Sequence, residues 1–594
     1  MEKDYIYEPL KTYKNELKDK HNENVNKYFD ELVEKSQIDI AANKATITRL
    51  NKKIKLFDNI KKRISNYSFL RVFLIITAIV LFVLPLFHFN SDTYNLDFLG
   101  ILIIALEFIV GIVLIVLIFK KINPFIKSLK TEKNVLRKRI DELTKEASIQ
   151  MQPLNDLFEE EMALQLFKQT LPLINFDKYF DTKRLEYLVK RFGLSDAPDY
   201  NRSTLYVKSG DINGNPFYIS NDLVHSLGTK TYTGSIIISW TTYTTVNGKR
   251  VSQRRTQTLT ASVNKPYPYY KEQSYLVYGN DAAPDLIFTR EDSDAENMNE
   301  KQIDRHVKRK VRKLQRKERK AIKKGGTFTT LAHSEFEVLF GAHDRNNEVQ
   351  FRLLFTPLAQ KQLLDLMKDK TIGYGDNFDF TKYKKINFVY PEHLDLIKLN
   401  VHPSYFHDID FEKIKKRFID YNNEYFKAVY FAFAPILSIP LYQQNKPHEY
   451  IYGDLYDGYV SFYEHESVVN TLGEERFKHK DSNTRNILKA SLVKSGNNFD
   501  HVNVTAYGYK TEPRVDYVPR VGGDGRTHLV PVHWTEYIPV TETTKVDINV
   551  VNEEKNMTYR DHFENYIKKL KDDKDIDKKD LILLNKFFAR VYKK

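Results

Sequence analysis

The sequence predicts an α+β membrane protein, with a two-helix transmembrane hairpin, a helical stalk and two antiparallel β-rich cytosolic domains. Three observations predict this class. Two apolar segments lie close together early in the chain, Lys and Arg flank them on one side only, and stretches beyond residue 153 alternate apolar and polar side chains. The chain has 594 residues, which is enough for two or three folded units.

The two apolar segments are residues 72–89 (VFLIITAIVLFVLPLFHF) and 98–119 (FLGILIIALEFIVGIVLIVLIF). At a rise of about 1.5 Å per residue each is long enough to cross a hydrocarbon core of about 30 Å. The polar segment before the first one lacks the short apolar region of a signal peptide. We therefore predict a transmembrane hairpin over residues 69–119. The alternative, two buried helices of a soluble core, would require a polar stripe.

The charges around the hairpin predict its orientation. The linker of residues 90–97 (NSDTYNLD) contains no Lys or Arg. Cations lie on the other side of both spans, at Lys61, Lys62, Arg63, Arg71, Lys120, Lys121, Lys127 and Lys130. By the positive-inside rule this predicts a multi-pass protein of the cell membrane with both termini in the cytoplasm.

Glu107 lies near the middle of the second apolar segment, where a lone charge costs several kcal/mol. Thr77 lies at a comparable depth on the first segment and is a candidate hydrogen-bond partner. A second candidate partner is the same glutamate in another copy of the chain. The two interpretations are a polar contact that holds helices together and a role in ion or proton passage.

The segments beside the hairpin are predicted to be helical, over an N-terminal region of residues 1–68 and a stalk of residues 120–152. Apolar residues follow helical spacing on both, at Ile47, Leu50, Ile54, Phe57, Ile64, Leu136, Ile140, Leu143 and Ala147. Because the hairpin returns the chain to the same side, these seams predict an antiparallel coiled coil. The alternative is that each helix packs on the cytosolic body.

Beyond the stalk we expect a β-rich domain at residues 153–398, a second at residues 399–552 and two C-terminal helices at residues 553–594. The segments TYTGSIIISWTTYTTV, SEFEVLF and EVQFRLLF are predicted strands, and LILLNKFF a predicted helix. The apolar run Phe431–Tyr442 contains Pro435 and Pro440 and is short, so we expect core and no third span.

A motif at residues 334–370 carries a family resemblance. It consists of an F-E-x-x-F segment, a charged strand, and a Thr-Pro pair before a helix, at Phe336, Glu337, Phe340, Phe355, Thr356 and Pro357. With YTGSIIISW at residues 232–240 and the two spans, it resembles the bacterial domain-of-unknown-function family 3137 over residues 30–395. The resemblance implies the layout and no activity. Abundant Lys, Asn, Tyr, Phe and Ile are typical of AT-rich bacteria such as mollicutes.

Residues 301–324 are a predicted basic amphipathic helix. They hold 13 Lys and Arg against Asp304 and Glu318, a local charge of +11 out of the chain's +14. Apolar residues fall on one face, at Ile303, Val307, Val311, Leu314 and Ile322. The predicted binding residues are Lys308, Arg309, Lys310, Arg312, Lys313, Arg316, Lys317, Arg319 and Lys320.

Three interpretations of this helix are open. Its charges are solvated and partly balanced by the acidic stretch EDSDAENMNE just before it, or they bind membrane lipids, or they bind an acidic protein or nucleic acid. The absence of interleaved aromatic residues argues against stacking on nucleic-acid bases.

The sequence offers little support for an enzyme. It has no cysteine and no P-loop, Rossmann glycine motif, HExxH or GxSxG, and we expect no cofactor and no catalytic residue. The only metal candidates are His402, His407, Asp408 and Asp410, close together in VHPSYFHDIDF. The leading prediction is therefore a membrane-anchored cytosolic scaffold or interaction protein, capable of forming homo-oligomers. The alternatives are a membrane-tethered metal-dependent hydrolase and an oligomer that passes ions or solutes.

Overall fold

The computed structural model describes residues 5–89, 98–178, 180–195, 199–246, 249–326, 328–446, 461–496, 499–550, 568, 581–584 and 587–592. The chain has an α+β fold with 50% helix and 30% strand. It divides into two compact units. The first comprises Met1–Val25, Glu159–His402 and Asn422–Lys594, and the second Asn26–Phe158 and Pro403–Tyr421. Both β-rich regions belong to the first unit.

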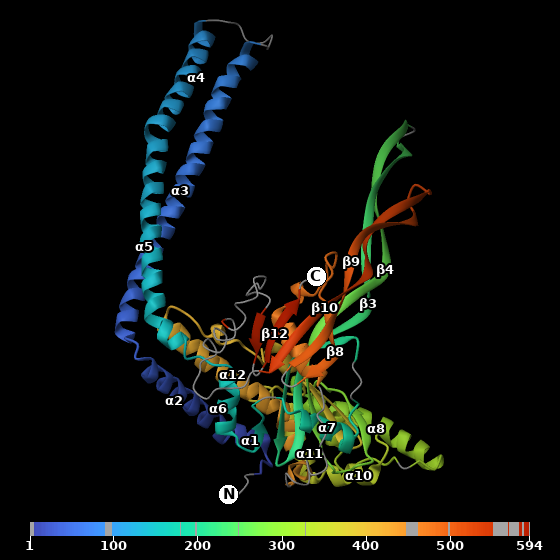
Figure 1. Cartoon of the computed structure of the whole chain (residues 1–594). Helices are drawn as coiled ribbons and strands as arrows, with labels where there is room; N and C mark the ends of the chain where they lie inside the picture. The colour runs from blue at the N-terminus through green and yellow to red at the C-terminus, as the bar shows by residue number, and fades with distance from the viewer. Residues whose placement is uncertain are drawn as a thin grey trace. The chain divides into compact units, whose positions relative to one another are not determined.

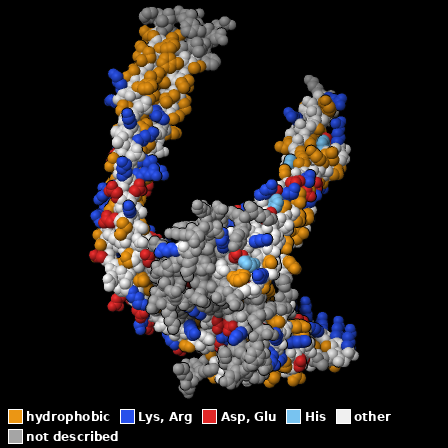
Figure 2. All heavy atoms as spheres, in the orientation of Figure 1, with side chains coloured by type: hydrophobic (Ala, Val, Ile, Leu, Met, Phe, Trp, Pro, Cys, Tyr) orange, Lys and Arg blue, Asp and Glu red, His pale blue; other side chains and the backbone are white. Residues whose placement is uncertain are grey.

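The second unit contains a long helical hairpin, visible in Figure 1. Its elements are α3 (Ile40–Phe89), α4 (Phe98–Leu117), the π-helical turn η2 (Ile118–Ile122) and α5 (Asn123–Asn155). Only 6% of the most apolar part of the first helix and 11% of that of the second is buried. Figure 2 shows apolar side chains covering this part of the surface. The chain therefore has two helices long and apolar enough to cross a membrane.

Below the apolar part, α3 and α5 lie along each other and bury part of the predicted seam. Leu50, Leu143 and Ala147 are buried, whereas Ile54 is 37% exposed. Polar residues also enter this contact. The buried Thr46 donates to Glu146 Oε1 (3.2 Å), which also pairs with Arg49 Nη2 (3.1 Å). The predicted pairing of the two helices is thus confirmed, with a seam that is apolar only in places.

The first forty residues are largely helical, as predicted. They form α1 (Pro9–Thr12), the π-helical turn η1 (Tyr13–Leu17) and α2 (Lys18–Ser36). In the first unit, the buried His21 accepts or donates at Thr170 Oγ1 (2.8 Å) and Asn422 O (3.1 Å), and burial lowers its pKa to about 4. The N-terminal residues of the chain are thus part of the packed first unit.

The first unit contains two antiparallel sheets. The larger has strand order β1-β2-β3-β4-β7-β6-β5. Its strands are β1 (Ile174–Phe176), β2 (Arg202–Ile212), β3 (Asn215–Val246), β4 (Lys249–Gly279), β5 (Ile287–Arg290), β6 (Phe378–Tyr383) and β7 (Ile386–Pro391). The smaller has order β11-β12-β10-β9-β8. Its strands are β8 (Ile487–Gly496), β9 (Phe499–Val521), β10 (Thr527–Val550), β11 (Leu581–Leu584) and β12 (Phe587–Tyr592).

The hairpins β3–β4 and β9–β10 continue well beyond their sheets and pack against each other (Figure 1). Their contact has an apolar centre of Ile238, Leu259, Ala261, Val530 and Val532. At Gly234 a Cβ atom would lie 2.0 Å from Pro531 O, so only glycine permits this approach of the two backbones. The distal part of both hairpins, residues 228–267 and 511–537, is called the arm below.

The chain has further helices beyond the hairpin. They are α6 (Met162–Thr170), α7 (Thr182–Phe192), α8 (Glu300–Lys323), α9 (Ser334–Phe340), α10 (Glu348–Leu354), α11 (Pro357–Lys368), α12 (Phe411–Leu437) and α14 (Phe462–Leu472). The predicted core run Phe431–Tyr442 includes the end of α12, where Phe433, Ala434 and Ile436 are buried in the first unit. The prediction of core at this run is confirmed.

Three predicted elements are wrong. SEFEVLF and EVQFRLLF, predicted as strands, are the helices α9 and α10, because Phe336, Leu339 and Phe340 at helical spacing bury one face. LILLNKFF, predicted as a helix, contributes to the strands β11 and β12, and β12 pairs with β10 from Lys545 to Val550. The helix predicted earlier in the tail lies outside the described residues, apart from residue 568.

Lys382 on β6 is fully buried, and among the described residues its ammonium group has no hydrogen-bond partner. Its Nζ lies 5.6 Å from the centre of the Tyr442 ring. Burial lowers the pKa of Lys382 to about 7. A buried amine whose pKa falls on folding destabilises the fold most below the folded pKa, and this penalty disappears as the pH rises to the unfolded pKa.

We expect Lys382→Met to stabilise the sheet around β6 by about 4 kcal/mol at pH 6. The gain should shrink between pH 7 and pH 10.5, as the wild-type amine loses its proton in the unfolded chain too. Hydrogen exchange of β6 amides in the full chain, compared between wild type and variant at each pH, measures this. A gain that does not change over that range would contradict the explanation.

Candidate functional site

The basic helix begins at a strong cap. The side chain of Asn299 accepts from the backbone N–H of Gln302 (3.0 Å), and the Gln302 side chain accepts from the N–H of Asn299 (2.8 Å). This reciprocal capping box satisfies two N–H groups that a helix start otherwise leaves unpaired. α8 therefore runs over Glu300–Lys323 as a continuous helix, and the predicted helix over residues 301–324 is confirmed.

A narrow row of apolar side chains packs α8 against the rest of the first unit. Ile303 and Leu314 are buried, and Leu314 packs with Phe328 and Val338. Val307, Val311 and Ala321 are partly buried against the same cluster. Ile322, which the spacing assigned to this face, is 61% exposed, so that assignment is wrong. The helix turns by about 100° per residue, and this rotation brings Ala321, not Ile322, into this row.

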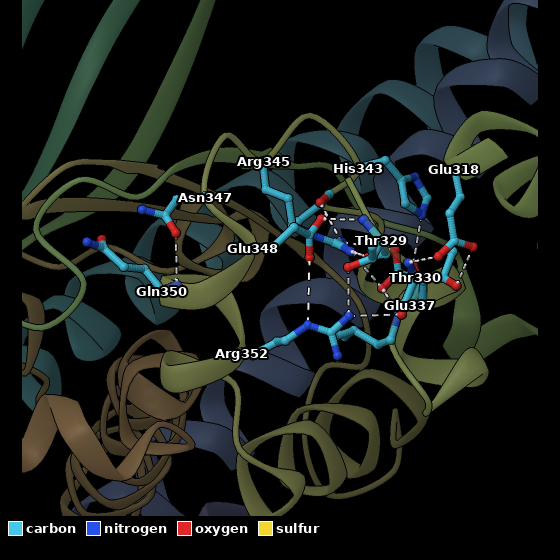
Figure 3. Close-up of polar contacts among 12 residues, drawn as sticks. Glu318, Thr329, Thr330, Glu337, His343, Arg345, Asn347, Glu348, Gln350 and Arg352 are labelled. Carbon is cyan, nitrogen blue, oxygen red and sulfur yellow. Dashed lines mark hydrogen bonds and ion pairs between the residues drawn. The ribbon is translucent and has the colours of Figure 1, made fainter. Parts of the chain in front are cut away.

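Polar contacts fix the second half of α8. Glu318 Oε2 accepts from Thr330 Oγ1 (3.1 Å), and Glu318 Oε1 accepts from Thr330 N (3.3 Å). Lys317 donates to the carbonyl of His343. Figure 3 shows Glu318 directed at Thr330, beside a second polar cluster. These bonds set the rotation of the helix about its axis, so the same side always faces outward.

The second cluster is centred on Arg345, whose side chain is 1% exposed. Its Nη1 lies 2.9 Å from Glu337 Oε1 and its Nε 2.8 Å from Glu348 Oε1. Its Nη2 donates to Thr329 O (2.8 Å). Figure 3 shows Arg345 pointing toward both carboxylates. Its guanidinium carbon also lies 4.9 Å from the centre of Phe328, so this buried network supports the ring that receives Leu314 of α8.

The outward side of α8 is cationic along its whole length. All nine predicted binding residues are exposed, and so are Lys301, Arg305, Lys323 and Lys324. Within the described part of the chain, none of these side chains forms an ion pair with a carboxylate, although Lys317 donates to a carbonyl. Figure 2 shows Lys and Arg side chains in a row along this projecting helix. The surface is an unbalanced positive strip.

The acidic stretch before α8 does not balance these charges. Glu296 Oε2 accepts from the backbone N–H of Asp376 (3.2 Å), and Asp376 accepts from Ser293 N (2.8 Å). Asp292 lies near Asp379 and Asp376, and burial followed by these like charges raises its pKa. Asp292 and Glu296 therefore face acids and backbone donors, and in the described residues no acid of this stretch pairs with a cation of α8.

The intramembrane candidates lie on separate helices, Thr77 on α3 and Glu107 on α4. The Thr77 hydroxyl donates to the carbonyl of Phe73 one turn earlier (2.9 Å), so that proton is used within its own helix. Glu107 is half-buried. The proposed contact between the two residues stays a prediction.

The four metal candidates serve different local structures. Asp410 accepts from Glu412 N (3.1 Å) at the start of α12, and Asp408 Oδ2 pairs with Arg417 Nη2 (3.2 Å). Burial lowers the pKa of His407. His402 lines a cavity of about 450 Å³ with residues that include Asp395 and Asn470. Among the residues that the structure describes, no group of three or more His, Cys, Asp or Glu is placed to hold a metal ion.

Taken together, the fold and this surface define the class of protein: an α+β chain with two candidate membrane-spanning helices and an exposed basic helix. Comparison with known protein families, with curated proteins and with solved structures finds no match. The resemblance to family 3137 therefore stays a prediction. Sequence reasoning missed the capping box and the Arg345 network. The pair Asn299 and Gln302 was a readable signal for the former.

Proposed function

We propose that this chain is a membrane-anchored scaffold or interaction protein that binds anionic lipid headgroups through the outward side of α8. The helical hairpin of α3 and α4 serves as its anchor. Cations flank the hairpin at only one end, which favours a cytoplasmic location for both termini and for the whole first unit.

The observation that carries the proposal is the unbalanced positive strip. Twelve exposed cations on α8 and Lys324 at its C-terminal cap form no ion pair with a carboxylate in the described residues. Each Lys or Arg near an anionic membrane surface contributes about 1 kcal/mol to binding. Membrane lipids are the most abundant anionic surface close to a membrane-anchored protein. The exposed side of α8 is nearly free of apolar side chains apart from Ile322, so the expected contact is electrostatic and superficial.

Vesicle capture tests this function. The full chain is placed in small discs of neutral lipid, mixed with larger vesicles and sedimented. We expect vesicles with about one third anionic lipid to carry the discs down, whereas neutral vesicles leave most of them in solution. About 0.5 M salt should weaken the capture strongly, because the Debye length then falls to a few Å.

The alternative is that α8 binds an acidic protein. Equal recovery of the discs with anionic and neutral vesicles would contradict lipid binding. In that case crosslinking from Ile322→Cys in living cells would identify what α8 contacts. The native chain has no cysteine, so a single introduced thiol gives an unambiguous position.

A further inference from the structure

The arm presents an apolar face that nothing in the described chain covers. On β9 and β10, residues of one parity point away from β3 and β4: Val515, Tyr517, Pro519 and Val521 with their partners Leu529 and Pro531. Val521 is 70% exposed, Tyr517 64% and Leu529 59%. No Asp, Glu, Lys or Arg lies on this face between residues 515 and 533. Figure 2 shows apolar and cationic side chains gathered on the arm.

The other side of the same hairpin is fully engaged. Val518, Val530 and Val532 pack on the β3–β4 hairpin, and Lys265 pairs with Asp516 (2.7 Å). Gly523 N donates to Gln257 Oε1 (2.7 Å) near the tip. The arm is therefore a two-layer structure, and the apolar face does not turn inward.

The edges of the β9–β10 hairpin do not accept an added strand readily. Pro513 and Pro519 lie on β9 beyond its pairing with β8, and Pro531 and Pro539 lie on β10 before its pairing with β12. Proline has no N–H to donate, so it interrupts the edge that another strand would pair with. On this hairpin, contact through the apolar face is thus favoured over addition of a strand at the edge.

The charged residues of the arm indicate which kind of partner its apolar face binds. Residues 241–258 of the neighbouring hairpin carry Lys249, Arg250, Arg254 and Arg255 and no acid. Residues 511–537 of the arm add Arg514, Arg520 and Arg526 against Glu512, Asp516, Asp524 and Glu536, and Arg514 pairs with Glu512 and Glu536. Asp516 pairs with Lys265, and Asp524 with His528, so the excess of positive charge comes from the β3–β4 hairpin. The end of the arm is thus positive. Two copies meeting face to face would bring these charges together, which disfavours a second copy.

We propose that the apolar face of the arm inserts shallowly into an anionic phospholipid bilayer. Such a bilayer offers an apolar layer directly beneath a plane of negative charge, which matches an apolar face on an arm whose end carries a net positive charge. Tyr517 is suited to the headgroup level, where amphipathic aromatic rings are favoured. This contact differs from that of α8 because it depends on apolar insertion, so either one can fail without the other.

The test uses the full chain in neutral discs and vesicles with about one third anionic lipid. The background is a variant with five α8 cations replaced by Gln, at Lys308, Arg309, Arg312, Lys313 and Arg316, so that residual capture reports on the arm. We expect Tyr517→Asp with Leu529→Asp to lower that residual capture at least tenfold. The matched control is Thr233→Asp with Ser235→Asp, which adds the same charge on the exposed, uncharged face of β3. The control should retain capture within about twofold.

Folding of the variants can be checked within the arm itself. Trp240 and Trp534 are the only tryptophans of the chain and both lie in the arm, so unchanged tryptophan emission without vesicles shows that it is intact. A dye on Tyr517→Cys should shift to the blue with anionic vesicles. Capture unaffected by the Tyr517 and Leu529 substitutions would overturn the proposal. So would a loss confined to self-association, which would assign the face to a second copy. Failure of the α8 proposal is distinct, because wild type and the glutamine background would then be captured equally.

Discussion

Replacing five α8 cations by Gln is expected to lower the affinity of the protein for anionic vesicles by about three orders of magnitude. The positions are Lys308, Arg309, Arg312, Lys313 and Arg316, all exposed and without ion pairs in the described structure. At about 1 kcal/mol each, five cations account for about 5 kcal/mol, and about 1.4 kcal/mol is a factor of ten. Glutamine is a good helix former, and Lys317 and Glu318 keep their contacts, so the helix should remain docked.

The matched control conserves the charge. Replacing Arg309, Arg312 and Arg316 by Lys keeps every positive charge and loses only the forked guanidinium geometry. An electrostatic contact with a lipid surface predicts nearly unchanged affinity for this variant. Titration of discs with vesicles of increasing anionic content gives both affinities. A loss of less than threefold in the glutamine variant would exclude α8 as the main lipid contact, whatever the arm contributes.

The long-range features of the chain were predictable because each depends on a repeated pattern. The two apolar helices and α8 are read from many residues at once, so no single ambiguous residue changes the result. The length of β3 and β4 was not predictable. Asn264, Lys265, Pro266 and Pro268 are typical of a turn, yet they lie within β4, paired with residues 227–231 of β3. Proline is tolerated there because β7 pairs only with residues 276–279 of β4.

Short apolar segments were predicted less well, for a physical reason. Seven or eight residues such as SEFEVLF or LILLNKFF bury an apolar face either as two helical turns or as a strand. Their neighbours in space decide between the two. Phe336 and Phe340 stack at 4.8 Å as a helical pair, whereas Phe587 is paired with Val550 of β10. These contacts join residues that are far apart in the sequence, so the local pattern does not predict them. The Arg345 network beneath α8 was not predicted either.

Removing the Arg345 side chain should destabilise the buried network on which α8 packs. Arg345→Met leaves the carboxylates of Glu337 and Glu348, whose side chains are 1% and 8% exposed, without their buried cation. Breaking a buried ion pair in this way costs about 3–5 kcal/mol. Met fills similar space but cannot replace the donors to Thr329 O and Ala342 O. Phe328 and Phe351 also lose the guanidinium at 4.9 and 4.4 Å from their ring centres.

The expected result is local opening of residues 328–355 together with α8, since Leu314 depends on Phe328. A cost of about 3–5 kcal/mol speeds hydrogen exchange of these amides about 10²- to 10³-fold. Strands β9 and β10 should exchange as in wild type. Adding Glu337→Gln and Glu348→Gln to Arg345→Met removes both orphaned charges and should recover most of the protection. If the triple variant exchanges as fast as the single one, the buried charges are not the cause, and apolar packing of Phe328 alone holds the basic helix in place.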